Sequence, residues 1–361
     1  MDLRNAGMAL HDWRDQLAGG AESGPGSQRL IRSVFVLWAI AFVIKHTGSS
    51  WDIAWHFRYP FGAFEPPHIV NIFGSAIAAA LVVFHTMTGK VTERFGLYII
   101  QGGFALFLVS VLLDVLNHLM FGLDVTVWSP THLLTFAATT VVMLGVVYTM
   151  LKLLPPGRWR LGLGLLFWAL LLDDALFQLC QQEYGVIAID AYTRGQTRAS
   201  SALLALAGRN PVAFAEGGIP HWIYPIWLIT TSTLVLAPAQ RVWGWRWSAC
   251  AVALLYLGFR VLGWLVLDAF AFPNSFIPVM LLGAAFLIDV AGQRRWPPLA
   301  ISLALTVCYY ASALLIDQYT LMPRFALGTA PVVFVLLWGG YALARWWAQR
   351  STDRPLAPVT R

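Results

Sequence analysis

Two short stretches in the first third of the chain carry the same pattern of one acid and two histidines. In each stretch a histidine follows the acid by four residues, and a second histidine follows a proline, twelve or fourteen residues further on. Residues four apart lie on one face of a helix, with Cβ atoms about 5–6 Å apart, and can share one metal ion. The pattern predicts two metal-binding sets: Asp52, His56 and His68, and Asp114, His118 and His132.

Two imidazoles and one carboxylate form an incomplete coordination shell. Three protein ligands leave positions open for water, oxygen or a substrate, as in catalytic metal sites. These ligands suit copper, iron or zinc better than magnesium or calcium. A single Asp or His at a membrane helix end is more often an interfacial hydrogen-bonding residue, but six in register favour metal binding. The two sets form either two mononuclear sites or one dinuclear site.

A partial third copy of the pattern occurs later in the chain. Asp174 is followed after four residues by Gln178 and, beyond a long loop, by His221 next to Pro220. These three polar residues form a candidate third site. Two acids near the full sets are candidates to accept hydrogen bonds from the ligating imidazoles: Glu65 and Asp124.

The composition places these residues in a membrane. The chain has 58% hydrophobic and 12% charged residues, 17 Trp and a mean hydropathy of +0.65, whereas soluble domains have about 25% charged residues. A membrane span needs about 20 apolar residues. We therefore predict an all-α polytopic membrane protein, built from repeated helical hairpins, with ten spans near 31–56, 66–88, 95–120, 130–152, 158–180, 220–238, 245–269, 273–292, 297–317 and 326–347.

Lys and Arg residues cluster at alternate ends of the predicted spans. Because basic loops stay on the cytoplasmic side, both termini are predicted to be cytoplasmic, in a multi-pass protein of the plasma or inner membrane. The pI near 9.4 follows from these loops and gives no support for nucleic-acid binding. The predicted organisation is a flexible cytoplasmic tail at 1–28, one transmembrane domain at 29–350 and a second tail at 351–361. Within that domain, 29–152 holds the metal-binding hairpin pair and 182–219 an extracytoplasmic loop.

Other polar residues within the apolar segments have a simpler interpretation. Lys45 and His46 lie inside the first predicted span, where we expect them to form an interhelical hydrogen bond. Cys180, Cys250 and Cys308 show no paired spacing, so we expect them to be packing residues without a disulfide or thiolate metal site.

The tandem pattern resembles the metal-binding membrane subunit of the particulate methane and ammonia monooxygenases, which are membrane copper enzymes. In that family the first set is Asp, His and His, and the second is Asn, His and His, each built from consecutive transmembrane helices. The resemblance covers about residues 30–150, and the matching residues are Asp52, His56 and His68 in the first set and His118 and His132 in the second. Asp114 stands where the family has an amide, which makes the second set more anionic and suits iron or zinc. The six further predicted spans and the lack of an extramembrane β-rich domain also depart from the family.

The ligands and the resemblance together favour a copper- or iron-dependent oxidase or monooxygenase. The resemblance implies copper first, with iron or zinc as alternatives. Such an enzyme would act on a small apolar or lipid-soluble substrate at the outer side of the membrane, alone, as a homo-oligomer or beside other membrane subunits. The alternatives are a metal carrier or transporter, and a zinc-dependent membrane hydrolase with Glu65 or Asp174 as general base. A transporter needs polar groups through the bilayer, and the sequence offers below the outer interface only Lys45, His46 and a few hydroxyls.

Overall fold

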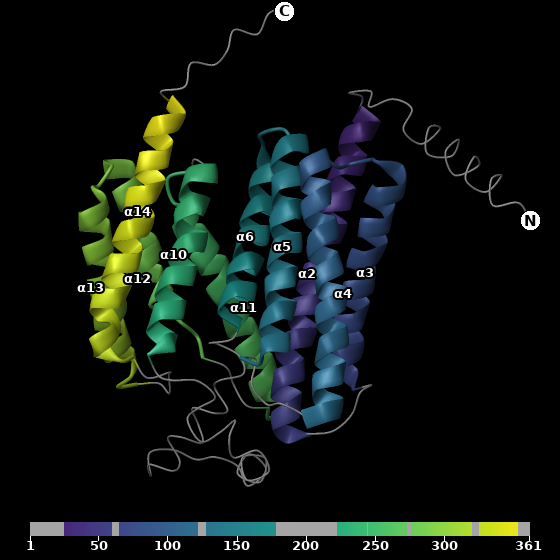
Figure 1. The fold of residues 1–361 in the computed structure, drawn as a ribbon, viewed down its shortest axis with the longest axis horizontal. Helices are drawn as coiled ribbons and strands as arrows, with labels where there is room; N and C mark the ends of the chain where they lie inside the picture. Colours follow the sequence, from purple (N-terminus) through teal and green to yellow (C-terminus); the bar gives the residue numbers. More distant parts are fainter. Residues whose placement is uncertain are drawn as a thin grey trace, which may run out of the picture.

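The computed structural model describes residues 25–59, 65–121, 128–177, 222–243, 245–272, 276–319 and 325–352. These residues form ten α-helices and no β-strand, so the all-α prediction is confirmed for the described part (Figure 1). The helices are α2 (Pro25–Arg58), α3 (Pro66–Thr88), α4 (Arg94–Phe121), α5 (Pro130–Leu153), α6 (Arg158–Phe177), α10 (Ile223–Trp243), α11 (Ser248–Ala269), α12 (Leu281–Arg294), α13 (Pro298–Ile316) and α14 (Ala330–Thr352).

Seven of these helices are long and apolar enough to cross a membrane, and this indicates a membrane protein. The seven helices are α2, α3, α4, α5, α11, α13 and α14. In their described residues the other three helices, α6, α10 and α12, are too short, too charged or not apolar enough to be counted as spans. α6 carries two arginines near its start and Asp173 and Asp174 near its end. α12 has 14 residues, about 21 Å at 1.5 Å per residue, against a hydrocarbon core of about 30 Å. Tyr, Trp, Pro and Thr residues interrupt the aliphatic run of α10.

The helix ends follow local sequence signals. Pro66 and Pro130 stand at the starts of α3 and α5, where a missing N–H group costs no hydrogen bond. Gly89, with φ of 63°, ends α3 in the left-handed conformation that glycine adopts without strain. The largest boundary difference is at α12, which begins at Leu281 and not near residue 273. Pro278 disfavours the helical conformation of the residue before it, so the helix starts beyond it.

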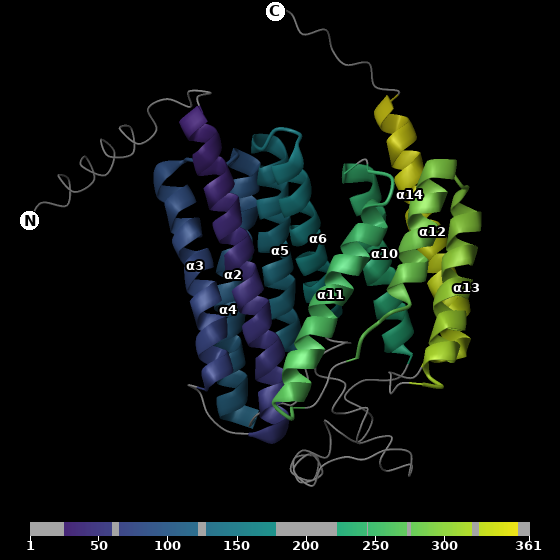
Figure 2. The ribbon, with the colours of Figure 1, turned by 180° about the vertical axis from the view of Figure 1, so that it is seen from behind.

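The helices form two groups with α11 between them (Figures 1 and 2). α2 to α6 lie together, and α10, α12, α13 and α14 lie together. α11 contacts α2 and α6 of the first group and α10 and α12 of the second, and α10 also contacts α6. α6 is buried along most of its length. It therefore lies in the centre of the molecule, although it carries two acidic residues.

Aromatic side chains fill the core between α2 and α6. Trp38 stacks on Phe42, and Phe42 meets Phe167 edge to face, with ring centroids 5.4 and 6.1 Å apart. On the outer face of α4, in contrast, Leu112 and Leu119 are exposed. Lipid tails are as apolar as these side chains, so close packing, more than exclusion of water, holds such helices together.

Glycines allow the hairpin helices to approach closely. A Cβ atom at Gly103 of α4 would lie 2.8 Å from the Val142 backbone nitrogen of α5, and one at Gly48 of α2 would lie 2.5 Å from the Asn71 nitrogen of α3. Small residues at such crossings are the usual way in which membrane helices pack backbone to backbone. In each hairpin that carries predicted metal ligands, the two helices are therefore held close together.

The start of α2 and the end of α14 lie at the same end of the bundle (Figure 1). The end of α4 and the start of α5, which carry the second predicted ligand set, lie at the opposite end. This arrangement agrees with the sequence pattern, in which basic residues and predicted metal ligands occupy opposite ends of the helices. The cytoplasmic assignment of the basic end stays a prediction.

Candidate metal centre

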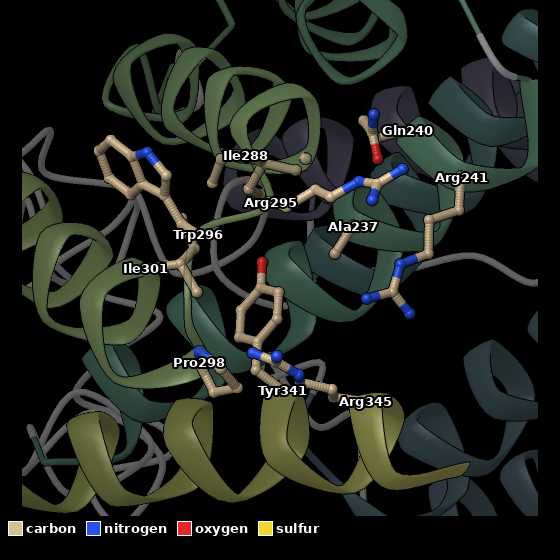
Figure 3. Close-up of a pocket in the computed structure, with 12 residues that line it drawn as sticks. Ala237, Gln240, Arg241, Ile288, Arg295, Trp296, Pro298, Ile301, Tyr341 and Arg345 are labelled. Atoms are coloured by element: carbon tan, nitrogen blue, oxygen red, sulfur yellow. The ribbon is translucent and has the colours of Figure 1, made fainter. Parts of the chain in front are cut away.

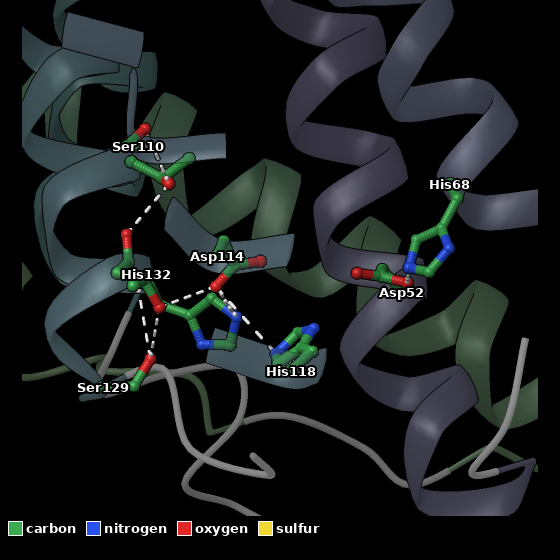
Figure 4. Close-up of polar contacts among 9 residues, drawn as sticks. Asp52, His68, Ser110, Asp114, His118, Ser129 and His132 are labelled. Atoms are coloured by element: carbon green, nitrogen blue, oxygen red, sulfur yellow. Dashed lines mark hydrogen bonds and ion pairs between the residues drawn. The ribbon is translucent and has the colours of Figure 1, made fainter. Parts of the chain in front are cut away.

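Asp114, His118 and His132 come together at the end of the α4–α5 hairpin (Figure 4). One ligand atom from each lies within 4.8 Å of the other two. Asp114 Oδ1 is 3.3 Å from His132 Nε2 and 3.9 Å from His118 Nε2. The two imidazole centroids are 5.7 Å apart, with the rings inclined at 73°. The three side chains are 22 to 30% exposed, so a ligand could reach the group from outside.

The sequence around residue 130 explains why His132 faces α4. The Ser129 hydroxyl caps α5 by accepting a hydrogen bond from the His132 backbone N–H at 3.4 Å. Pro130 begins the helix, and this places His132 in the first turn. Asp114 and His118 lie in the last two turns of α4, so helix pairing brings the three side chains together.

Thr131 holds the carboxylate in place. Its hydroxyl donates a hydrogen bond of 2.7 Å to Asp114 Oδ1. One turn further along α5, the Thr135 hydroxyl donates to the Ser110 hydroxyl of α4 at 3.0 Å. The sequence reasoning missed Thr131, because a threonine in the first turn of a helix carries no sign of its partner. Its position four residues before Thr135, which places both hydroxyls on one face of α5, is the signal that could have suggested it.

The spacing of the three side chains fits one transition-metal ion. Ligand bonds of about 2.0–2.2 Å in tetrahedral geometry place two ligand atoms about 3.4 Å apart. The 3.3 and 3.9 Å separations are close to this value. Two imidazoles and one carboxylate also form a donor set suited to copper, iron or zinc. Among the described residues, no second group of three His, Cys, Asp or Glu side chains has such geometry.

The first predicted set is described only in part. Asp52 of α2 and His68 of α3 form an ion pair, with 2.8 Å between Oδ1 and Nε2, and lie on the other hairpin (Figure 4). Pro66 and Pro67 begin α3, so His68 occupies its first turn as His132 does in α5. His56 belongs to α2, but its side chain lies outside the described residues. The structure thus brings Asp52 and His68 together, and the full set stays a prediction, as does a dinuclear site.

The remaining predicted site residues are only partly described. Glu65 precedes α3, and its buried Oε2 atom has no hydrogen-bond partner in the described part of the chain. No contact among the described residues therefore supports the predicted role of Glu65 as a hydrogen-bond acceptor for His68. Asp124, Gln178 and His221 lie outside the described residues, so the third set stays a prediction. Asp174, its first member, is fully buried and accepts a hydrogen bond of 2.5 Å from the Thr140 hydroxyl of α5.

Ionisable side chains from three helices meet inside the bundle. The group consists of Lys45 and His46 of α2, Asp173 and Asp174 of α6, and Arg260 of α11, none of them more than 7% exposed. We call it the buried charge cluster. His46 stands between the two acids, with Nδ1 3.1 Å from Asp173 Oδ2 and Nε2 3.9 Å from Asp174 Oδ1.

The charges of this cluster compensate each other. The Arg260 guanidinium is 3.8 Å from Asp173 Oδ1. The Lys45 ammonium lies over the rings of Phe107 and Phe136, 5.5 and 5.9 Å from their centroids. Two basic side chains, Lys45 and Arg260, and two acidic ones, Asp173 and Asp174, share the site. Burying any one of them unpaired would be costly, which is why they occur together.

The sequence reasoning recognised only part of this cluster. It treated Lys45 and His46 as hydrogen-bonding residues and assigned Asp174 to a third metal set. Asp173 and Arg260 were not singled out as site residues. Ionisable residues within apolar helices are functional candidates by default, and this rule could have marked both. Their meeting could not be predicted, because it depends on which helices pack around α6.

The threonine hydroxyls of α5 contact two different neighbouring helices. Thr131 contacts Asp114 and Thr135 contacts Ser110, both on α4, whereas Thr140 contacts Asp174 of α6. At 3.6 residues per turn, Thr140 lies on the opposite side of α5 from Thr131. α5 thus bonds to a candidate metal ligand on one side and to the buried charge cluster on the other.

Comparison of the chain with protein-family models, with curated proteins and with solved structures gives no match.

Proposed function

We propose that the chain is a membrane metalloprotein that oxidises a small apolar or lipid-soluble substrate, with Asp114, His118 and His132 holding a copper or iron ion. The observation that supports this proposal most strongly is the convergence of three ligand atoms within 4.8 Å at one hairpin end. The two-residue core of the first set, Asp52 and His68, supports a second centre of the same kind. A relationship to the copper membrane monooxygenases belongs to the proposal and rests on ligand spacing.

The bound metal would supply oxygen activation, with a net reaction in which substrate RH, O₂, two electrons and two protons give ROH and water. The electrons must come from an external donor. The chain itself orients the ligands: Thr131 fixes the Asp114 carboxylate, and the Ser129 cap fixes the first turn of α5. Hydrogen bonds to ligating groups of this kind tune metal affinity.

An apolar substrate could approach from the lipid side. Leu119 and Met120 follow His118 on α4 and are 78 and 72% exposed. Val115 and Leu116, between the two α4 ligands, are also exposed. A molecule dissolved in lipid would thus reach the ligands along an apolar surface.

Metal content and oxygen consumption of the purified full chain test the proposal together. Wild-type protein in lipid nanodiscs, loaded with copper or iron and then desalted, should retain metal in stoichiometric amount. With ascorbate as reductant and a small hydrocarbon as substrate, it should consume oxygen and form the alcohol. His118→Ala should lose both the metal of this centre and the activity.

His85→Gln provides the matched control, because His85 lies near the end of α3 and is hydrogen-bonded to Trp38. It should keep full metal content. Unchanged metal content in His118→Ala and His132→Ala would remove the site assignment. Stoichiometric metal without oxygen consumption would keep the metal centre and reject the oxidation chemistry.

Metal transport is the second candidate function, and the buried charge cluster favours it. From the sequence we expected few polar groups in the bundle interior, whereas five ionisable side chains lie buried there. Lys45 and Arg260, however, place positive charge where a cation would pass, so oxidation stays first. Metal uptake into vesicles separates the two functions: a transporter would take up metal, and Asp174→Asn would stop uptake without emptying the outer triad.

A further inference from the structure

A second polar site lies at the opposite end of the molecule from the metal ligands, between α10, α12, α13 and α14. It is a cavity of about 360 Å³. Three arginines from three elements border it: Arg241 at the end of α10, Arg295 at the end of α12 and Arg345 near the end of α14. Figure 3 shows their side chains around a common space, with the Tyr341 hydroxyl pointing into it.

Among the described residues, no acidic group balances the positive charge of this cavity. The twelve lining residues include no Asp or Glu. In the described part of the chain, no ion pair joins Arg241, Arg295 or Arg345 to a carboxylate. Asp289 of α12 is directed elsewhere, since its carboxylate oxygens accept hydrogen bonds from the backbone N–H groups of Ala249 and Cys250 at 3.2 and 2.9 Å.

Tyr341 provides an independent indication of a ligand. Its hydroxyl is buried and has no hydrogen-bond partner among the described residues. A buried hydroxyl without a partner costs free energy, and a bound acceptor group in the cavity would remove that cost. The Gln240 amide also lines the cavity and can donate hydrogen bonds to the same group.

The alternative interpretation is that the arginines only anchor the helices at the membrane surface. Arg246, at the same end of the bundle, is an example: it bonds to the Gln293 side chain at 2.8 Å and stacks on Trp247. Arg246 makes these contacts as a single arginine and does not line the cavity. Three guanidinium groups around one cavity that also contains an unpartnered hydroxyl match an anion site better, because guanidinium binds phosphate in bidentate fashion.

We propose that this cavity binds a phosphate group, and that in the membrane the phosphate belongs to the headgroup of an anionic phospholipid. Basic cavities between membrane helices are common headgroup sites. The surroundings favour a lipid, because the two helices that border the cavity, α13 and α14, also carry exposed apolar side chains, among them Leu299 and Leu343. Trp296 at the cavity suits the level of the headgroups. The proposal is independent of the metal centre.

Native mass spectrometry of the detergent-solubilised full chain, combined with thermal unfolding, tests the site. Phosphatidylglycerol should remain bound to the wild type and raise its unfolding temperature, whereas phosphatidylcholine should do neither. The double variant Arg295→Gln/Arg345→Gln should weaken phosphatidylglycerol binding by at least about tenfold. Tyr341→Phe, which keeps the shape of the ring, should weaken it several-fold. Arg246→Gln should bind as the wild type does.

A separate experiment with inorganic phosphate alone decides whether the site recognises a lipid headgroup or any phosphate group. If millimolar phosphate stabilises the wild type and competes with the lipid, but not in the arginine variant, the site is a general phosphate site. If only the lipid binds, the headgroup assignment holds. Equal binding of the two lipids, or equal binding by Arg246→Gln, Tyr341→Phe and wild type, would overturn the proposal. Tyr341→Phe gives this answer even if the double variant does not fold.

Discussion

At the scale of single residues, Asp114 is the centre of the proposed metal site. Its Oδ1 atom accepts a hydrogen bond from Thr131 and faces the Nε2 atoms of His118 and His132. A carboxylate in this position adds a negative charge that an amide would lack, and it binds a cation more strongly for that reason. The hydroxyl of Thr131 fixes its orientation before metal arrives.

Removing that hydroxyl should weaken metal binding without removing a ligand. We expect Thr131→Val to lower copper or zinc affinity about 10- to 100-fold, the usual effect of losing a hydrogen bond to a ligating group. Competition with a chelator of known affinity measures this change. Thr135→Val is the control, because Thr135 bonds to Ser110 and not to a ligand. Equal affinity in wild type and Thr131→Val would show that Asp114 needs no such support.

At the scale of helices, the hairpin bearing the triad was largely predictable from the sequence. Acid and histidine four residues apart predicted a shared helix face, and the proline before His132 predicted the start of the next helix. The bounds predicted for α3, α4 and α5 agree with the structure to within one or two residues. Long apolar runs with proline or glycine at their ends leave little freedom in where such helices begin and end.

Features that depend on packing could not be predicted. The buried charge cluster unites residues of α2, α6 and α11, and no local pattern records that these helices touch. The late start of α12 at Leu281 reflects Pro278 inside an apolar run that hydropathy alone assigns to a span. The hydrogen bond between Thr131 and Asp114 depends on how α4 and α5 are shifted along each other.

The close approach of α4 and α5 gives a prediction at this scale. Gly103→Ala places a Cβ atom 2.8 Å from the Val142 backbone nitrogen, so the helices must separate. We expect a loss of about 1–3 kcal/mol in unfolding free energy, as for other overpacked sites, together with weaker metal binding. Gly102→Ala is matched, because nothing lies within 4 Å of its added Cβ atom. Thermal unfolding and chelator competition of both variants decide whether hairpin spacing controls the site.

At the scale of the whole molecule, the two helix groups are joined around α6 and α11. α11 contacts helices of both groups, and its Arg260 reaches Asp173 of α6 in the buried charge cluster. The helix ends that border the basic cavity and those that carry the metal ligands lie at opposite ends of the bundle. The molecule thus has one polar site near each end and a further group of polar residues between them.

Breaking the pair between Arg260 and Asp173 should destabilise the whole bundle. We expect Arg260→Met to cost about 3–5 kcal/mol of unfolding free energy, because it leaves the buried carboxylates with less positive charge. Adding Asp173→Asn should restore part of this loss, since the uncompensated charge is then removed. Unfolding of the two single variants and the double variant forms the test. Strictly additive losses would mean that the two side chains do not interact.

The central claim is that one ion is held by the side chains of Asp114, His118 and His132. X-ray absorption spectroscopy of the copper-loaded full chain tests it most directly. We predict nitrogen and oxygen neighbours at about 2.0 Å, with scattering from two imidazoles at this centre and weaker imidazole scattering per chain in His118→Ala. A spectrum without imidazole scattering, or one identical in wild type and His118→Ala, would contradict the account.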